Sequence, residues 1–167
     1  ETSDDRAVAS AIKEMKVRGA PAIGVAGAYA VALGALKIKA MAKGEFLKKL
    51  KNISQTLVST RPTARNLFRA IERMEQVAKS GKDIEQIRRA VISEAVRIHS
   101  EEAEATKKLS QLGAGLIQDN FTILTHCNTG ALATAGYGTA LGIIKQARKQ
   151  GKDIKVFATE TRPLLQG

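Results

Sequence analysis

The sequence is poor in aromatic residues and in cysteine. Aromatic side chains make up 4% of its 167 residues, and tryptophan is absent. The core must therefore be aliphatic, and few rings are available to stack on nucleic-acid bases. The single cysteine, Cys127, excludes an internal disulfide. Nothing in the cysteine content indicates secretion, and we expect a cytoplasmic protein.

Acidic residues are also in the minority. The chain has 27 Lys and Arg residues against 16 Asp and Glu residues, which gives a formal net charge of +11. This balance is compatible with nucleic-acid binding. The basic residues are, however, spread along the chain and form no polybasic tail. We therefore expect a solvated basic surface and no nucleic-acid partner.

Residues 19–36 carry no charge and approach the length of a membrane span. The segment is rich in Gly and Ala and poor in Leu, Ile and Phe, which is unfavourable for membrane insertion. It is more typical of a closely packed helix in a soluble protein, and we expect no membrane partner.

Apolar periodicity predicts a series of helices in the first two thirds of the chain. The expected helices cover residues 4–15, 21–41, 45–60, 62–80 and 83–112. Pro21 and Pro62 are each placed in the first turn of their helix, where proline is well tolerated. The apolar stripe of the last helix continues to Leu109 and Leu112 and is typical of a bundle core.

After residue 118 the pattern changes to a strand (121–125), a glycine-rich turn, a helix (135–149) and a second strand (154–158). These elements form one βαβ unit. The expected fold class is α/β, with an amino-terminal helical bundle domain (1–118) followed by the opening βαβ part of a Rossmann-like parallel sheet (119–167). Two parallel strands do not make a stable sheet alone, and parallel sheets need cover on both faces. We therefore expect the chain to be part of a larger protein.

Cys127 is the first candidate for a functional residue. It follows the predicted strand 121–125, and α/β sheets bind their ligands at the carboxyl ends of such strands. Amide groups of the following helix would favour the thiolate. The alternative is a small buried apolar thiol. The polar neighbours His126, Asn128 and Thr129 favour a site.

Two further segments, 18–21 and 60–63, place an arginine just before a proline. Helix starts expose amide N–H groups that suit anions, and arginine adds a forked donor for phosphate. Either Arg18 or Arg61 alone is compatible with a surface cation near a helix cap, whereas the repeated context favours phosphate binding. The sequence contains no Walker loop, and its glycine spacing does not fit a dinucleotide fingerprint. His99 has no second histidine at ligand spacing, so we expect no metal site.

Four motifs carry a resemblance to a known family. They are Met15-Lys16-Val17-Arg18-Gly19-Ala20-Pro21-Ala22-Ile23-Gly24, Arg61-Pro62-Thr63-Ala64, His126-Cys127-Asn128-Thr129-Gly130-Ala131-Leu132-Ala133-Thr134 and Glu160-Thr161-Arg162-Pro163-Leu164-Leu165-Gln166-Gly167. In order and approximate spacing they resemble the methylthioribose-1-phosphate isomerases. The wider superfamily includes ribose-1,5-bisphosphate isomerases and the regulatory subunits of eukaryotic translation initiation factor two-B.

The resemblance implies an aldose–ketose isomerase of methionine salvage that converts 5-methylthioribose 1-phosphate to 5-methylthioribulose 1-phosphate. It also implies a homodimer that works without a metal or other cofactor. Cys127 matches the catalytic cysteine of the family. The substrate-binding positions of the family match Arg18, Gly19, Ala20, Arg61 and Gln166. The catalytic aspartate and an Asn-Lys pair of the family lie beyond residue 167, so we expect this chain alone to be inactive.

Three alternatives stay open. The first is a ribose-1,5-bisphosphate isomerase, and the second is a non-catalytic regulatory subunit related to initiation factor two-B. The third is a basic nucleic-acid-binding module. The presence of both Cys127 and the 18–21 segment disfavours the regulatory subunit. The sequence does not separate an acid–base role of Cys127 from stabilisation of the migrating charge.

Overall fold

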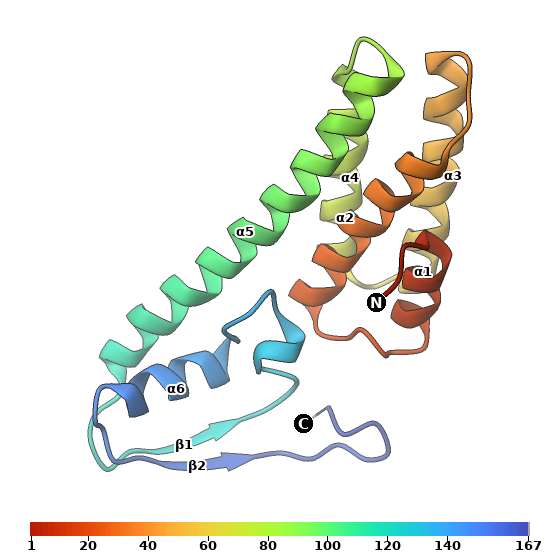
Figure 1. The fold of residues 1–167 in the computed structure, drawn as a ribbon. Helices are drawn as coiled ribbons and strands as arrows, with labels where there is room; N and C mark the ends of the chain where they lie inside the picture. Colours follow the sequence, from red (N-terminus) through yellow and green to blue (C-terminus); the bar gives the residue numbers. More distant parts are fainter. Residues whose placement is uncertain (167) are drawn as a thin grey trace. The chain divides into compact units, whose positions relative to one another are not determined.

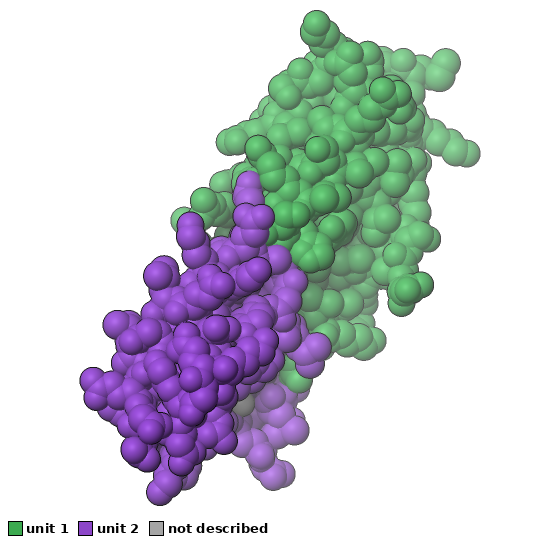
Figure 2. All heavy atoms as spheres, turned by 60° about the vertical axis from the view of Figure 1, so that its left-hand side comes forward, with its two compact units in different colours: residues 1–100 green, residues 101–167 purple. Residues whose placement is uncertain are grey.

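The computed structural model describes residues 1–166, and Figure 1 shows the order of its elements. The elements are α1 (Asp5–Lys13), α2 (Ala20–Lys37), α3 (Lys43–Thr60), α4 (Arg65–Ser80), α5 (Ile84–Leu116), β1 (Thr122–Thr125), the 3-10 helix η1 (Ala131–Ala133), α6 (Ala140–Lys149) and β2 (Lys155–Ala158). The chain forms two compact units, Glu1–Ser100 and Glu101–Gly167, which are coloured separately in Figure 2. Their boundary lies inside α5. The expected domains, 1–118 and 119–167, were divided where the secondary structure changes from helices to strands. This domain division stays a prediction.

The core of unit 1 is aliphatic, as the composition requires. Phe46 is its fully buried aromatic side chain. The fully buried aliphatic side chains around it are Ile12, Val31, Leu50, Leu57, Leu67, Met74, Ile87 and Val91. Burial of such side chains is the main favourable contribution to folding, at about 1.5–3 kcal/mol for each one.

Small residues let α2 lie directly against α4. A methyl group added at Gly24 would lie 3.0 Å from the carbonyl oxygen of Asn66, and one added at Gly27 would collide with the side chain of Leu67. By length and composition α2 is apolar enough to cross a membrane, but more than half of it is buried within the protein. We therefore interpret α2 as the core helix that its Gly and Ala content predicts.

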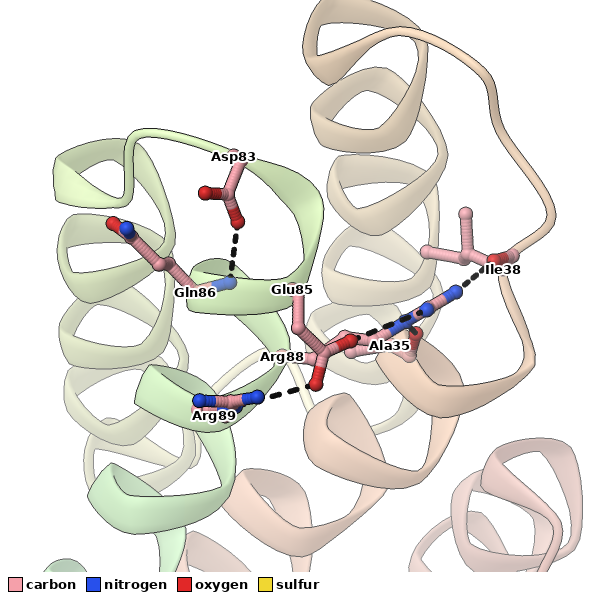
Figure 3. Close-up of polar contacts among 7 residues, drawn as sticks. All are labelled: Ala35, Ile38, Asp83, Glu85, Gln86, Arg88 and Arg89. Atoms are coloured by element: carbon pink, nitrogen blue, oxygen red, sulfur yellow. Dashed lines mark hydrogen bonds and ion pairs between the residues drawn. The ribbon is translucent and has the colours of Figure 1, made fainter.

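The end of α2 and the start of α5 are held by specific polar contacts. Arg88 of α5 donates from Nε to the carbonyl oxygen of Ala35 at 3.2 Å and from Nη2 to that of Ile38 at 2.8 Å (Figure 3). These bonds satisfy carbonyl groups that a helix end leaves without partners. The helix accordingly ends at Lys37 and not at the expected Met41. Asp83 accepts a hydrogen bond from the amide of Gln86 at 2.8 Å, which confirms the expected start of the fifth helix.

The prediction that a helix begins at Pro62 is wrong. Pro62 and Thr63 lie in a turn in which the amide of Ala64 donates to the carbonyl oxygen of Arg61 at 3.0 Å. Proline is as favourable at the second position of such a turn as in the first turn of a helix. The helix α4 begins only at Arg65, after the non-helical Ala64 (ψ 84°).

The apolar stripe of α5 is buried only in its first part. Ile87, Val91, Ala95 and Ile98 are buried as expected. Ala105, Leu109 and Leu112 are exposed, and the residues buried in their place are Thr106, Ser110 and Ala114. The two hydroxyl groups donate to carbonyl oxygens of their own helix, which removes the cost of burying them. Small side chains are needed here because α6 lies close, as shown by the contact that a methyl group at Gly142 would make with Ser110.

Unit 2 contains the expected βαβ connection. The strands β1 and β2 are parallel, with Thr122 opposite Lys155 and Thr125 opposite Ala158. Ile144 and Ala147 of α6 pack with Ala114 and Ile154 in a small second core. The opposite face carries the paired residues Leu124 and Phe157, which are 70% and 62% exposed. One apolar face of this parallel sheet is therefore uncovered within the described residues.

Two glutamates of α5 provide a matched test of the core. Glu94 is 5% exposed and accepts from Arg73 Nε at 2.9 Å and from Arg97 Nη2 at 2.6 Å. Glu85 is 60% exposed, and it pairs with Arg88 and Arg89 (Figure 3).

We predict that Glu94→Gln lowers the free energy of unfolding by about 2 kcal/mol, because it removes the buried carboxylate charge that pairs with Arg73 and Arg97. The control Glu85→Gln changes it by less than about 0.5 kcal/mol, because exposed pairs add little. Urea denaturation of both variants measures the difference. Equal losses in the two variants would contradict the structural role of Glu94.

Candidate functional site

The first group of candidate residues lies where α2 begins. Gly19 is the N-cap residue, and its backbone has φ 93° and ψ 128°, a conformation that glycine adopts readily. Pro21 lies in the first turn, as the sequence predicts. No side chain caps the helix, so Gly19, Ala20 and the half-buried Arg18 surround a helix start whose amide groups suit an anion.

Arg61 lies in the turn between α3 and α4 and is half-buried. Its Nη1 atom is buried and has no hydrogen-bond partner among the described residues. A buried donor without a partner costs about 1–3 kcal/mol, so such a group indicates a place where a ligand can bind. The contact of Gly24 with Asn66 places the first turns of α2 and α4 side by side. The turn of Arg61 and the loop of Arg18 therefore adjoin neighbouring helix starts.

Cys127 follows β1 directly, at the carboxyl end of a parallel strand, as predicted. The cysteine is exposed, so the alternative of a buried apolar thiol is wrong. Its backbone has φ 74°, in the left-handed region that non-glycine residues rarely adopt. Such strained residues persist only where the surrounding contacts hold them, and they are frequent in functional sites.

The helix expected at about 135–149 is present and ends at Lys149, but it starts later than predicted. The helix α6 begins at Ala140, and a loop with the short η1 precedes it. The start of α6 nevertheless folds back onto the cysteine loop, because the amide of Thr139 donates to the carbonyl oxygen of Thr129 at 2.9 Å. Gly138 permits this approach: its φ is 100°, and a methyl group there would lie 2.9 Å from the same oxygen.

Three threonines that sequence reasoning did not single out shape this loop and its neighbourhood. Thr134 accepts from the amides of Gly136 and Gly138 at 3.2 and 3.1 Å. The amide of Thr139 donates to the carbonyl oxygen of Thr129, as described above. The hydroxyl oxygen of Thr159 lies 2.8 Å from Nδ1 of His126. The signal for Thr159 was its position directly after the second strand, in register with His126 after the first.

Gln166 lies after the turn that follows β2 and is half-buried. Its backbone amide donates to the hydroxyl group of Thr161 at 3.1 Å. Gly167, the last residue of that motif, lies outside the described residues. Arg18, Gly19, Ala20 and Arg61 thus belong to unit 1, and Cys127 and Gln166 belong to unit 2.

His99, at which the sequence offered no partner for a metal site, is part-buried, and its Nδ1 atom lies 2.9 Å from the hydroxyl oxygen of Tyr29. Within residues 1–166 no group of three or more His, Cys, Asp or Glu side chains is arranged to hold a metal ion.

A family model described as the initiation factor 2 subunit family matches residues 16–167. The chain belongs to this family. Curated relatives named methylthioribose-1-phosphate isomerase are 59% identical in Dehalococcoides mccartyi and 53% identical in Geobacter metallireducens. Each match covers the whole chain and 50% or 49% of the relative. The chain therefore spans about half the length of the curated relatives it matches.

Solved structures of the family are similar to the chain as well. One is titled translation initiation factor eIF-2B, subunit delta, from A. fulgidus, with 44% identity and a TM-score of 0.85 over the whole chain and 49% of that protein. Another is 5-methylthioribose 1-phosphate isomerase from Pyrococcus horikoshii, with 33% identity and a TM-score of 0.84 over 93% of the chain and 52% of that protein. These likenesses confirm the resemblance that the four sequence motifs indicated.

Proposed function

We propose that the full-length protein carrying this chain is a methylthioribose-1-phosphate isomerase of methionine salvage. It converts 5-methylthioribose 1-phosphate to 5-methylthioribulose 1-phosphate. The observation that carries the proposal is the 59% identity with an isomerase of that name across the whole chain. The proposal includes a cytoplasmic homodimer, and it includes a helical domain (1–118) followed by the start of a Rossmann-like domain (119–167).

The phosphorylated sugar is bound, in this proposal, by Arg18, Gly19, Ala20, Arg61 and Gln166. The start of α2 has no side-chain cap and presents amide groups to an anion. The buried Nη1 of Arg61 has no partner among the described residues, and a phosphate oxygen would satisfy it. A charge-assisted bond of this kind contributes about 1.5–3 kcal/mol.

Cys127 is the proposed catalytic residue, and no cofactor takes part. An aldose–ketose isomerisation moves a hydrogen between C1 and C2, which needs two acid–base groups placed about the substrate. The exposed thiol at the end of β1 supplies one of them or stabilises the migrating charge. The family resemblance places the partner aspartate beyond residue 167. We therefore propose that this chain alone does not turn over the sugar.

A regulatory role is the second candidate, because the structure of 44% identity is titled as an initiation factor subunit. NMR of the full-length protein with 5-methylthioribose 1-phosphate tests both candidates, with ribose 1,5-bisphosphate in a parallel sample. We expect conversion of the first sugar alone, and none by residues 1–167 alone. Conversion of the bisphosphate alone would change the substrate, and no conversion of either sugar would favour the regulatory role.

We predict that Arg61→Ala in the full-length protein raises KM about 10- to 100-fold, because one charge-assisted bond to the sugar phosphate is lost. The matched control is Arg69→Ala, since Arg69 is exposed on α4. It should change KM by less than about twofold. Steady-state kinetics measure both variants, and a normal KM in Arg61→Ala would remove this residue from the site.

We predict that Cys127→Ser lowers kcat by at least about 100-fold, the range expected for loss of an acid–base group. The exposed side chain adds little to the core, so circular dichroism should show an unchanged fold. Near-normal turnover by this variant would refute the catalytic assignment, whatever its KM.

A further inference from the structure

The backbone of Cys127 has a left-handed conformation just beyond the carboxyl end of β1. Its φ of 74° is costly for a residue with a side chain. The residue before it, His126, follows β1, and Thr159 follows β2. Because Thr125 lies opposite Ala158 in the parallel register, His126 and Thr159 occupy equivalent positions just beyond the sheet.

A side-chain hydrogen bond joins these two positions. His126 Nδ1 lies 2.8 Å from the hydroxyl oxygen of Thr159. The strands do not need this bond for pairing, because the amide of Thr159 already donates to the carbonyl oxygen of Thr125 at 3.2 Å. What the side-chain bond adds is a fixed orientation for the His126 ring and for the backbone that leads into Cys127.

The other side of the cysteine is tied in the same way. The hydroxyl groups of Thr125 and Thr129 lie 3.1 Å apart, and the carbonyl oxygen of Thr129 accepts from the amide of Thr139. Cys127 is thus a strained residue between two anchored neighbours, with its thiol exposed. Anchors of this kind determine where a reactive group lies, and a displacement of about 1 Å can cost about 100-fold in rate.

We infer that His126 and Thr159 are positioning residues that set the location of the Cys127 thiol through their shared hydrogen bond. The inference deepens the proposed isomerase function and rests on it for the role of the thiol. Neither residue belongs to the substrate-binding set, so loss of their bond should affect kcat and leave KM close to normal.

The test uses the full-length protein with Thr159→Val, which removes the hydroxyl group and keeps the side-chain shape. We expect kcat to fall about 10-fold and KM to stay within about twofold. Thr159→Ser keeps the hydroxyl group and should retain kcat within about twofold. Thr122→Val makes the same substitution at the exposed start of β1 and serves as the matched control.

A double-variant cycle shows whether the two residues act as one unit. His126→Ala should lower kcat as Thr159→Val does. The kcat of the double variant should be no lower than that of the less active single variant. Independent, multiplying losses would overturn the inference, because each residue would then act on its own.

Alkylation of Cys127 by iodoacetamide separates this inference from the proposed function. The rate is followed at one fixed pH by mass spectrometry of the peptide that contains Cys127, without any sugar. Thr159→Val should change the alkylation rate, because the thiol is displaced, whereas Thr159→Ser and Thr122→Val should not. If the wild-type protein is inactive but Thr159→Val changes the alkylation rate, the isomerase proposal is wrong and the positioning pair is kept. If the wild-type protein is active but Thr159→Val leaves both kcat and the alkylation rate unchanged, the positioning pair is wrong and the isomerase proposal is kept.

Discussion

The contact between α2 and α4 is the constraint on which unit 1 depends. The carbonyl oxygen of Asn66 is part of a helix backbone and cannot rotate away, so a side chain opposite it at Gly24 would push the helices apart. A side chain at Gly27 would instead require the buried Leu67 side chain to move. The consequence reaches beyond packing. Two helices that approach this closely bring their amino-terminal ends together, and the loops before both ends carry an arginine. The close helix contact thus brings the two loops that carry the proposed anion-binding arginines into one region of unit 1.

In unit 2 the strand register places the side chains around the proposed catalytic cysteine. In a parallel pair, residues that follow equivalent positions in the two strands leave the sheet at the same edge. The register of β1 and β2 brings His126 and Thr159 into hydrogen-bond distance, and Gly138 lets the start of α6 return to Thr129. The loop of Cys127 is therefore held by backbone geometry that local sequence patterns alone do not reveal.

Much of the fold follows from the sequence, and the exceptions have physical causes. Periodicity located the helices because burial repeats with the helical turn, and Pro21 marked a helix start correctly. The helix start predicted at Pro62 is wrong because proline is as favourable in a turn as in the first turn of a helix. The predicted burial of Leu109 is wrong because the second half of α5 has two faces of small or apolar residues. Only the packing of α6 decides which face is buried. The motifs singled out Arg61 and Cys127 as candidates, and their roles stay predictions. Thr159 lies 33 residues from its partner, so only its position after the second strand, and no local motif, could have indicated it.

The two units differ in the chemistry that they offer. Unit 1 provides donors, namely arginine and the amides of a helix start, and unit 2 provides an exposed thiol in a loop anchored by threonine hydroxyl groups. Under the proposed function, such donors bind the phosphate, whose bond to the sugar is kept, and this binding energy can be used to orient the neighbouring reacting carbons. The exposed thiol is the proposed acid–base group. Binding a phosphate needs donors only, whereas moving a hydrogen between two carbons needs a second acid–base group, which the resemblance places beyond residue 167.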